Sequence, residues 1–175
     1  MSDKKCILSR EKLARRVAEL GQEISERYQG RSLVLVGVLN GAFIFMADLA
    51  RSLTIDVELD FIRVASYGMS STSSGTISLS KDVELDLTGK DVLLVEDIID
   101  TGRTLAWLKE FFRTKGAASV CVCTLIDKKE RRQNQVEVDY LGFIVEEGFL
   151  VGYGLDCAEQ FRNLPAVYHL ETPPL

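Results

Sequence analysis

The sequence predicts an α/β fold in which helices flank an open, mostly parallel, twisted sheet. Three apolar runs, residues 33–39, 91–97 and 119–126, have the length and the Val- and Leu-rich composition of strands that are covered on both faces. Segments with helical spacing of apolar residues occur between such runs. This alternation of strand and helix argues for parallel strands joined by right-handed crossovers.

The first half of the chain contains two predicted helices and two predicted strands. Ser9 is a suitable N-cap for a helix that stops at Gly30 and whose apolar residues recur at helical spacing: Leu13, Val17, Leu20, Ile24 and Tyr28. The buried strand 33–39 runs into a tight turn at Asn40-Gly41. A helix over 42–52 follows, and then a strand over 55–64 whose apolar alternation is broken by charges.

Residues 66–80 form a segment rich in Ser, Gly and Thr that offers little apolar surface to bury. A loop of this length inside a domain is uncommon and is typical of lids and binding loops, with plain disorder as the alternative. The strand 91–97 then stops in acidic residues, and a helix over 105–115 is ended by Gly116. The strand 119–126 completes this unit.

Length and composition indicate one domain, residues 1–175. Of the 175 residues 46% are hydrophobic and 3 are proline, so the chain can bury a full-sized core. Lys and Arg number 21 against 26 Asp and Glu, and the net charge of −5 argues against bulk binding to nucleic acid or to membrane surfaces. The polar N-terminal residues resemble neither a signal peptide nor a transit peptide, which favours a cytoplasmic protein.

The four cysteines, Cys6, Cys121, Cys123 and Cys157, do not indicate a disulfide scaffold and should stay reduced. Cys121 and Cys123 share one face of a predicted strand. Zinc binding is the alternative to a role as small buried apolar side chains, and the absence of a Cys-x-x-Cys or His partner favours burial.

The strongest candidate site is the segment Glu96-Asp97-Ile-Ile-Asp100-Thr-Gly-Arg-Thr104, where a buried strand ends. Ligands of open α/β sheets bind beyond the carboxyl ends of the strands. The turn from Asp100 to Thr104 offers backbone N–H groups and two hydroxyls to a phosphate, and the adjacent carboxylates suit a metal ion or sugar hydroxyls. The alternative is a helix capped by Asp100 or Thr101, with acids near its positive end.

This segment resembles the signature loop of the type I phosphoribosyltransferases, which holds 5-phosphoribosyl 1-diphosphate. More narrowly, the chain is similar to the bacterial hypoxanthine-guanine phosphoribosyltransferase family from residue 33 almost to residue 170. Four further segments carry the likeness, the last two being specific to purine enzymes: Val38-Leu-Asn-Gly-Ala-Phe43, Asp60-Phe-Ile-Arg-Val-Ala-Ser-Tyr67, Leu125-Ile-Asp-Lys-Lys-Glu-Arg-Arg132 and Phe149-Leu-Val-Gly-Tyr-Gly-Leu-Asp156. The family fold adds to the sheet a small hood built from the two termini.

The resemblance implies an Mg²⁺-dependent enzyme of purine salvage that transfers the phosphoribosyl group to N9 of hypoxanthine or guanine. Glu96 and Asp97 would bind the ribose hydroxyls and help to hold Mg²⁺. The loop that would cradle the 5-phosphate consists of Asp100, Thr101, Gly102, Arg103 and Thr104. Asp100 would also lie beside N7 of the purine, where a carboxylate suits the acidity that N7–H gains as N9 attacks the anomeric carbon.

The resemblance assigns base recognition to Lys128, Phe149 and Leu150. Lys128 would reach the 6-oxo group and select against adenine, because an ammonium group donates hydrogen bonds and cannot accept them. Phe149 would stack on the base and the backbone of Leu150 would read its other edge. Without the resemblance, Lys128 belongs to a charge run typical of a solvated loop, and Phe149 is by default a core residue.

Further segments would hold the diphosphate and the metal ion. Asp156 resembles the second Mg²⁺ ligand and Arg162 a bidentate contact to the diphosphate, although alone both are ordinary surface charges. Asn40 and Gly41 correspond to the diphosphate loop, where a non-proline cis peptide turns a backbone N–H toward the leaving group. Many relatives carry Lys in place of Asn40, so the contact here would rest on backbone amides. Arg103 replaces a frequent Lys and keeps the charge.

The loop 66–80 matches the family's mobile lid, in which Ser66 and Tyr67 would close over the diphosphate and exclude water. The implied partners are 5-phosphoribosyl 1-diphosphate and 6-oxopurine bases, with no nucleic acid and no membrane. A homodimer or a homotetramer is implied, without a choice between them. The resemblance assigns no role to His169.

Two other functions remain open on the sequence. A regulatory RNA-binding protein can use the same fold, but it would need a basic face, which the net charge of −5 disfavours. A phosphoacceptor domain built around Glu96 and Asp97 would leave the Thr- and Gly-rich phosphate turn without a task.

Overall fold

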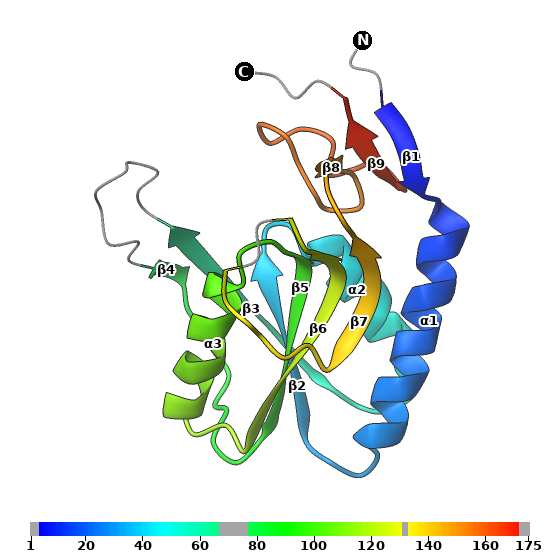
Figure 1. Cartoon of the computed structure of the whole chain (residues 1–175). Coiled ribbons are helices and arrows are strands. Elements are labelled where there is room, and N and C mark those ends of the chain that lie inside the picture. The colour runs from blue at the N-terminus through cyan, green and yellow to red at the C-terminus, as the bar shows by residue number, and fades with distance from the viewer. Residues whose placement is uncertain (1–3, 67–76, 131–132, 172–175) are drawn as a thin grey trace.

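The structure is a computed structural model that describes residues 4–66, 77–130 and 133–171. Its central sheet has the strand order β4-β3-β2-β5-β6-β7 (Figure 1). Five neighbouring strands run parallel to one another, in the order β3-β2-β5-β6-β7. The edge strand β4 lies antiparallel to β3. The bounds are Leu33–Leu39 for β2, Glu58–Ser66 for β3, Ile77–Lys81 for β4, Asp91–Ile99 for β5, Ser119–Lys128 for β6 and Tyr140–Val145 for β7.

Helices cover both faces of this sheet, as Figure 1 shows. Helices α1 (Arg10–Arg27) and α2 (Phe43–Ser52) contribute to one core with Leu33 and Leu35 of β2. Helix α3 (Arg103–Thr114) contributes to a second core with the alternate β2 residues, among them Val34. Successive residues of a strand point to opposite faces, so a continuous apolar run fills both cores. The predicted fold class is confirmed.

A smaller sheet joins the two ends of the chain. Its order is β1-β9-β8, with β1 at Lys4–Leu8, β8 at Phe149–Val151 and β9 at Val167–Leu170, all antiparallel. Its residues Leu8, Leu150 and Val167 belong to the same core as α1 and α2. This small sheet, with the loop 152–166, is the hood that the family resemblance implied.

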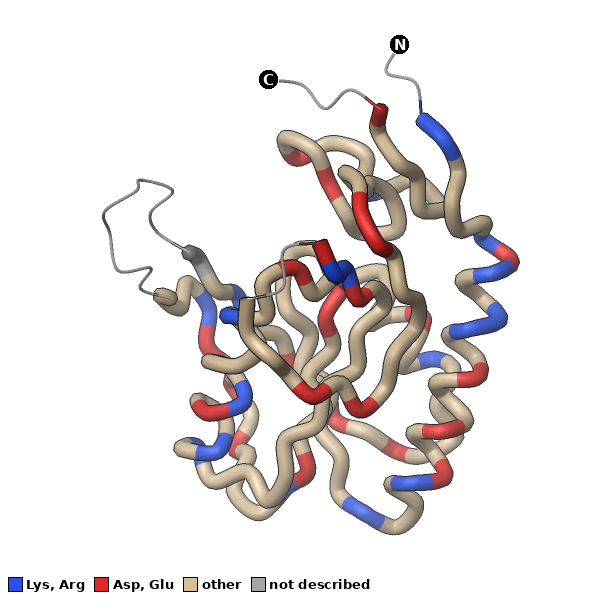
Figure 2. The backbone as a smooth tube through the Cα atoms, in the orientation of Figure 1, with Lys and Arg blue, Asp and Glu red and all other residues tan. Residues whose placement is uncertain are grey.

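Helix α1 confirms its predicted cap and buried face. The Ser9 hydroxyl accepts a hydrogen bond from the backbone N–H of Lys12 at 3.3 Å, and the buried face includes Leu13, Val17, Leu20 and Ile24. The helix ends at Arg27, and Gly30 lies in the turn that follows. Most basic residues of α1 lie in its first half and most acidic residues in its second half (Figure 2), and Arg16 lies 3.0 Å from both Glu19 and Glu23.

The structure corrects part of the predicted loop 66–80. Residues 77–81 form β4, in which Leu79 pairs with Val64 and packs against the α3 core. The strand was hidden because Ile77 and Leu79 alternate with serines in a Ser-rich segment. Residues 67–76, including Tyr67, lie outside the described residues.

Other bounds differ by a few residues. Strand β3 begins at Glu58 instead of residue 55, because Ile55 and Val57 pack against the core from the connection before the strand. Strand β5 continues to Ile99, and α3 begins at Arg103 rather than 105. Cys121 and Cys123 are both buried in the α1–α2 core, which confirms that they share a face. Within the described ranges, no helix combines the length and the apolar character needed to span a membrane.

Candidate active site

The predicted signature loop connects β5 to α3 at the carboxyl end of the sheet. The N-cap of α3 is Gly102, whose φ of +82° lies in the left-handed region, and no side chain caps the helix. Neither Asp100 nor Thr101 is therefore the N-cap residue, although the Thr101 hydroxyl lies within reach of the first backbone N–H of the helix. The carbonyl of Thr101 accepts hydrogen bonds from the backbone N–H groups of Gln133 and Asn134, at 3.0 and 2.9 Å. These bonds tie the loop to the segment after β6.

A pocket of about 150 Å³ lies at this loop. Its walls include Glu96 and the loop residues Asp100, Thr101, Gly102 and Thr104. The side chain of Arg103 is exposed, and its backbone N–H lies 3.4 Å from the Thr101 hydroxyl. Backbone N–H groups and hydroxyls at a helix N-terminus suit a bound phosphate.

Glu96 and Asp97 are both buried, each 8% exposed. The backbone N–H of Asp97 lies 3.3 Å from a Glu96 carboxylate oxygen, and Asp97 accepts a hydrogen bond from the Ile98 N–H at 2.8 Å. Burial raises the pKa of the Glu96 carboxyl well above its usual range, and the charge of Asp97 adds to this. Burial likewise raises the pKa of Asp97, against the opposing influence of its hydrogen bonds and of Arg162. A nearby cation would favour the charged form of both groups.

The loop after β2 contacts Asp97 directly. The peptide bond between Leu39 and Asn40 is cis, as the family resemblance implied. A Cβ added to Gly41 would lie 1.7 Å from Oδ2 of Asp97, so any larger residue would require this carboxylate to move. The loop and the end of β5 therefore form one packed unit.

A second pocket, of about 260 Å³, adjoins the first. Among its lining residues are six that the sequence analysis singled out: Asp97, Asp100, Lys128, Phe149, Leu150 and Asp156. Asp100 and Ile98 line both pockets. The structure thus brings the phosphate loop and the predicted base-binding residues together around Asp100.

The alternatives for Lys128 and Phe149 were a solvated charge and a core residue, and the structure differs from both. The Lys128 side chain is only 13% exposed and its ammonium group lies 3.0 Å from a Glu130 carboxylate oxygen, so it is not a freely solvated charge. Phe149 is 40% exposed and is not a core residue.

Asp156 and Arg162 pair with each other rather than pointing into solvent. Their charged groups lie 2.9 Å apart, and the Arg162 side chain is 20% exposed. Arg162 also donates to the carbonyl of Gly154 at 2.9 Å and contacts Glu159 at 3.1 Å. Neither residue is an ordinary surface charge.

The three predicted Mg²⁺ ligands divide between the pockets. Glu96 lines the phosphate-loop pocket, whereas Asp97 and Asp156 line the second one. Over the described ranges, no three acidic, His or Cys side chains converge as a complete metal site. The donor chemistry of Glu96 and Asp97 suits a hard cation, but further ligands have to come from elsewhere.

Of the two predicted lid residues, the structure describes only the backbone of Ser66. Ser66 ends β3, and its side chain is not among those described; Tyr67 lies outside the described residues.

The sequence analysis missed the contact made by Gly154. Its φ is +103°, and an added Cβ would lie 2.0 Å from the carbonyl oxygen of Gly41. The only available signal was the pair of glycines around Tyr153, which carries no information about a partner more than a hundred residues earlier.

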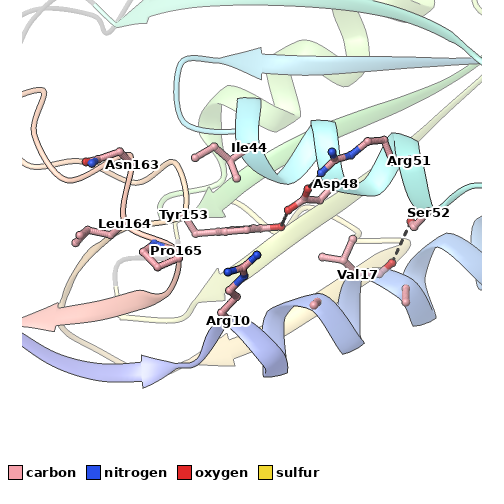
Figure 3. Close-up of a pocket in the computed structure, with 12 residues that line it drawn as sticks. Arg10, Val17, Ile44, Asp48, Arg51, Ser52, Tyr153, Asn163, Leu164 and Pro165 are labelled. Carbon is pink, nitrogen blue, oxygen red and sulfur yellow. Dashed lines mark hydrogen bonds and ion pairs between the residues drawn. The ribbon is translucent and has the colours of Figure 1, made fainter.

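A larger cavity, of about 640 Å³, lies away from these residues between α1, α2 and the hood loop (Figure 3). It is lined mainly by Ile44, Asp48, Tyr153 and Leu164 with residues of α1, and its lining includes none of the predicted site residues whose side chains the structure describes. The chemistry that the loop, the carboxylates and Lys128 provide lies at the two smaller pockets.

Comparison with known proteins identifies the family of the chain. Residues 4–158 match the family model described as the phosphoribosyl transferase domain. The chain is 44% identical to the hypoxanthine-guanine phosphoribosyltransferase of Bacillus subtilis over 163 residues, covering 93% of this chain and 91% of that protein. It is 45% identical to the hypoxanthine phosphoribosyltransferase of Escherichia coli, covering 87% of this chain and 86% of that protein.

One group of relatives is longer. The chain is 45% identical to the bifunctional protein TilS/HprT of Listeria monocytogenes and spans 25% of its length. Among solved structures, a hypoxanthine-guanine phosphoribosyltransferase from Bacillus anthracis superposes with a TM-score of 0.91 at 41% identity, covering 97% of this chain and 99% of that one. The chain therefore belongs to the phosphoribosyl transferase family and, within it, groups with the hypoxanthine-guanine phosphoribosyltransferases.

Proposed function

We propose that the chain transfers the 5-phosphoribosyl group from 5-phosphoribosyl 1-diphosphate to N9 of hypoxanthine or guanine, with release of diphosphate. The observation that carries this proposal is the position of Asp100, which lines both the phosphate-loop pocket and the pocket of Lys128 and Phe149. A residue at this boundary is close to both halves of a bond that forms between a ribose and a base.

The loop from Asp100 to Thr104 is the proposed site of the 5-phosphate. The left-handed conformation of Gly102 turns the chain so that α3 begins directly after the loop. Its N-terminal N–H groups have no carbonyl partner within the helix and can donate to phosphate oxygens. The charge of Arg103 adds to this attraction from the exposed side.

Lys128, Phe149 and Leu150 are the proposed base-binding residues. The Lys128 ammonium group can donate to a 6-oxo oxygen and offers nothing to the 6-amino group of adenine. The half-exposed ring of Phe149 leaves one surface available for stacking on a purine. Glu130, 3.0 Å from Lys128, holds the ammonium group beside the pocket.

Glu96, Asp97 and Asp156 are the proposed ligands of a divalent cation, which we assign as Mg²⁺. Bound Mg²⁺ would neutralise charge on the diphosphate leaving group. Because the three carboxylates do not form a complete site in the described residues, oxygens of the substrate and water would complete the ligand shell. Glu96 and Asp97 can also accept hydrogen bonds from the ribose hydroxyls.

Asp100 is the proposed proton acceptor. As N9 forms its bond to the anomeric carbon, positive charge grows on the purine ring and the proton on N7 becomes more acidic. A carboxylate held beside N7 accepts this proton or stabilises the charge.

The diphosphate would bind the backbone N–H groups of Asn40 and Gly41 and the side chain of Arg162. Asn40 offers no charge, so the N–H groups of this loop carry the contact. Arg162 is engaged with Asp156 and Glu159. Binding of diphosphate would therefore require it to exchange at least one carboxylate for a phosphate oxygen. The lid role of Ser66 and Tyr67 stays a prediction.

The test is a direct assay of the purified chain with Mg²⁺, 5-phosphoribosyl 1-diphosphate and one base at a time. We expect nucleotide formation with hypoxanthine or guanine and none with adenine, and the comparison with xanthine defines the range of 6-oxopurines. Nucleotide release is followed by chromatography. If neither hypoxanthine nor guanine yields nucleotide, the proposed function is wrong.

We also propose that the chain forms a homodimer or a homotetramer. Exposed apolar side chains that could be covered in such an assembly include Phe43, Leu59 and Ile144, which are 44%, 49% and 56% exposed. Light scattering coupled to size-exclusion chromatography distinguishes the two assemblies, and a monomeric mass at micromolar concentration contradicts both.

A further inference from the structure

Two loops that are distant in the sequence fix one side of the site by direct contact. Gly154, in the hood, lies so close to Gly41 that an added Cβ would be 2.0 Å from the Gly41 carbonyl oxygen. Gly41 in turn lies against the carboxylate of Asp97. Asp156 follows Gly154 by two residues and lines the same pocket as Asp97, so the contact between Gly154 and Gly41 lies next to this pair of carboxylates.

Tyr153 holds the hood loop from the other side. It is a non-glycine residue with φ of +52°, a conformation that surrounding contacts must maintain. Its backbone N–H donates to the carbonyl of Leu164 at 2.8 Å, and its ring is buried, with 6% exposure. Its hydroxyl donates to Oδ2 of Asp48 at 2.7 Å (Figure 3).

The partner of Tyr153 lies on the helix that continues the diphosphate loop. Asp48 belongs to α2, and the N-cap of α2 is Ala42, directly after Gly41. The other oxygen of Asp48 accepts a hydrogen bond from Arg51, so the carboxylate is held from two sides. Burial, with the bond to Asp48, raises the pKa of the Tyr153 hydroxyl above its ordinary value, so the group remains a donor at neutral pH.

We propose that Tyr153 is a positioning residue, whose hydrogen bond to Asp48 holds Gly154 against Gly41 and thereby sets Asp156 opposite Asp97 for binding of 5-phosphoribosyl 1-diphosphate. This inference rests on the proposed function. The bond exists before the ligand arrives, so it keeps the binding-competent arrangement populated. Tyr153 itself lines the larger cavity and does not line either pocket of the site.

The alternative is that Tyr153 only stabilises the core, to which its ring belongs. Replacement by Phe separates the two roles, because it keeps the buried ring and removes only the hydroxyl. A core role would lower the midpoint of thermal unfolding without changing ligand affinity. A positioning role changes the affinity for 5-phosphoribosyl 1-diphosphate more than the turnover at saturation.

The experiment is a calorimetric titration of Tyr153→Phe with 5-phosphoribosyl 1-diphosphate in the presence of Mg²⁺ and without base. We expect the dissociation constant to rise about 3- to 10-fold, as the loss of one hydrogen bond predicts. We expect kcat at saturating substrate and KM for the base to change by less than about twofold. An unchanged dissociation constant overturns the proposal, even if the thermal midpoint falls.

Asp48, whose side chain is 34% exposed, provides the second variant. Asp48→Ala should reproduce the loss of affinity, and Asp48→Asn, which keeps an acceptor oxygen, should restore most of it. The double variant Tyr153→Phe/Asp48→Ala should bind no more weakly than the single variant that has the lower affinity. The reason is that each single substitution already removes the same hydrogen bond. Full additivity of the two losses overturns the proposal.

Tyr168→Phe is the matched control. Tyr168 lies on β9 of the hood, paired with Cys6 and Val151, and lines neither pocket of the site. The dissociation constant of Tyr168→Phe for 5-phosphoribosyl 1-diphosphate should match that of the unmodified chain. If Tyr168→Phe loses as much affinity as Tyr153→Phe, the effect belongs to any hood tyrosine, which contradicts the proposal. If the unmodified chain binds no 5-phosphoribosyl 1-diphosphate at all, the proposed function fails as well, which separates that outcome from a failure of Tyr153 alone.

Discussion

Asp100 lies where two different kinds of binding surface meet. One pocket that it lines contains the loop with its backbone and hydroxyl groups together with Glu96, and the other contains Lys128, Phe149 and two further carboxylates. The first suits a phosphate and the second suits a flat polar ring. A carboxylate at this boundary can act on charge that develops in the ring while the loop holds the sugar phosphate still.

Replacement of Asp100 by Asn tests this role at the scale of one residue. The amide has nearly the same shape but cannot accept a proton, so we expect kcat to fall by roughly 10²- to 10⁴-fold. The circular dichroism spectrum and thermal midpoint should stay close to those of the unmodified chain. Steady-state kinetics with hypoxanthine measure the effect, and turnover within a few fold of normal would remove Asp100 from the mechanism.

At this scale, the sequence predicted local chemistry better than contacts between distant residues. The two buried carboxylates and the phosphate turn could be recognised because each belongs to one short segment at the end of an apolar run. The surroundings of Lys128 and Phe149 could not, because their pocket is made by β5, β6 and the hood together. Gly154 and Tyr153 gave no signal, since their partners, Gly41 and Asp48, are set by the packing of the hood on α2.

At the scale of elements, α3 carries the same backbone conformation at both ends. Gly102 precedes the helix with φ of +82°, and Gly116 follows it with φ of +83°. Both values favour glycine, because a side chain in this region strains the backbone. Only Gly102 belongs to the proposed phosphate loop, whereas an added Cβ at Gly116 would meet Thr88 at an ordinary distance of 3.5 Å.

The two glycines therefore form a matched pair of variants. Gly102→Ala and Gly116→Ala should each lower the free energy of unfolding by about 1–2 kcal/mol, measured by denaturant titration. Only Gly102→Ala should weaken binding of 5-phosphoribosyl 1-diphosphate, because it would distort the N–H groups that we propose hold the 5-phosphate. Equal affinity in the two variants would argue against a phosphate site at this loop.

The edge of the sheet depends on a second element, the segment after β4, which is anchored on Asp60. Although burial alone would raise the pKa of the Asp60 carboxyl, backbone N–H groups of Leu85, Phe61 and Glu84 lower it, with help from Lys81. These N–H groups lie 2.9, 2.7 and 2.6 Å from the Asp60 oxygens. The Asp60 carboxylate thus accepts the backbone hydrogen bonds that a neighbouring strand would otherwise accept from the segment after β4.

Asp60→Asn should lower the free energy of unfolding at pH 7 by about 1–3 kcal/mol, because an amide offers one acceptor oxygen instead of two. The folded-state pKa of Asp60 is depressed, so its stabilisation is present above the ordinary carboxyl value of about 4 and is lost as the pH falls below it. The difference between the two chains should therefore shrink in acid. Asp56→Asn, an exposed acid nearby, is the control and should have little effect at either pH.

At the scale of the whole molecule, a net charge of −5 has to be reconciled with a polyanionic substrate. Glu96 and Asp97 are buried, and burial raises the pKa of both carboxyl groups, while Lys128 and Arg162 are paired with other acids. Attraction for the substrate would therefore come from a bound cation and from backbone amides rather than from a basic surface. Composition alone argued against a broad basic face, but it could not show how a local site would compensate for the acidic charge.

The prediction of one domain also belongs to this scale. Alternation of apolar runs indicated the parallel sheet and its covering helices, since burial on two faces leaves a direct mark on the sequence. The edge strand β4 and the association of the two termini left a weaker mark; in β4, two of the five residues are serine. Whether hood and sheet unfold together depends on the core they share, in which Leu8, Leu150 and Val167 pack with the residues of α1 and α2.

The shared core predicts that hood and sheet unfold in one cooperative transition. Trp107 reports from α3, on the face of the sheet covered by the other core, and Cys157 reports from the hood, where it is buried with Val151 and Leu170. In a denaturant titration, the fluorescence of Trp107 and the labelling of the Cys157 thiol, read by peptide mass spectrometry, should share one midpoint. Cys123, buried in the central sheet, serves as the internal reference, and exposed Cys6 marks complete labelling.

Labelling of Cys157 at a clearly lower denaturant concentration than Cys123 would mean that the hood opens independently, since local opening exposes a segment below the global transition. The chain would then consist of two cooperative units and the site, which takes Asp97 from one and Asp156 from the other, would be assembled only when both are folded.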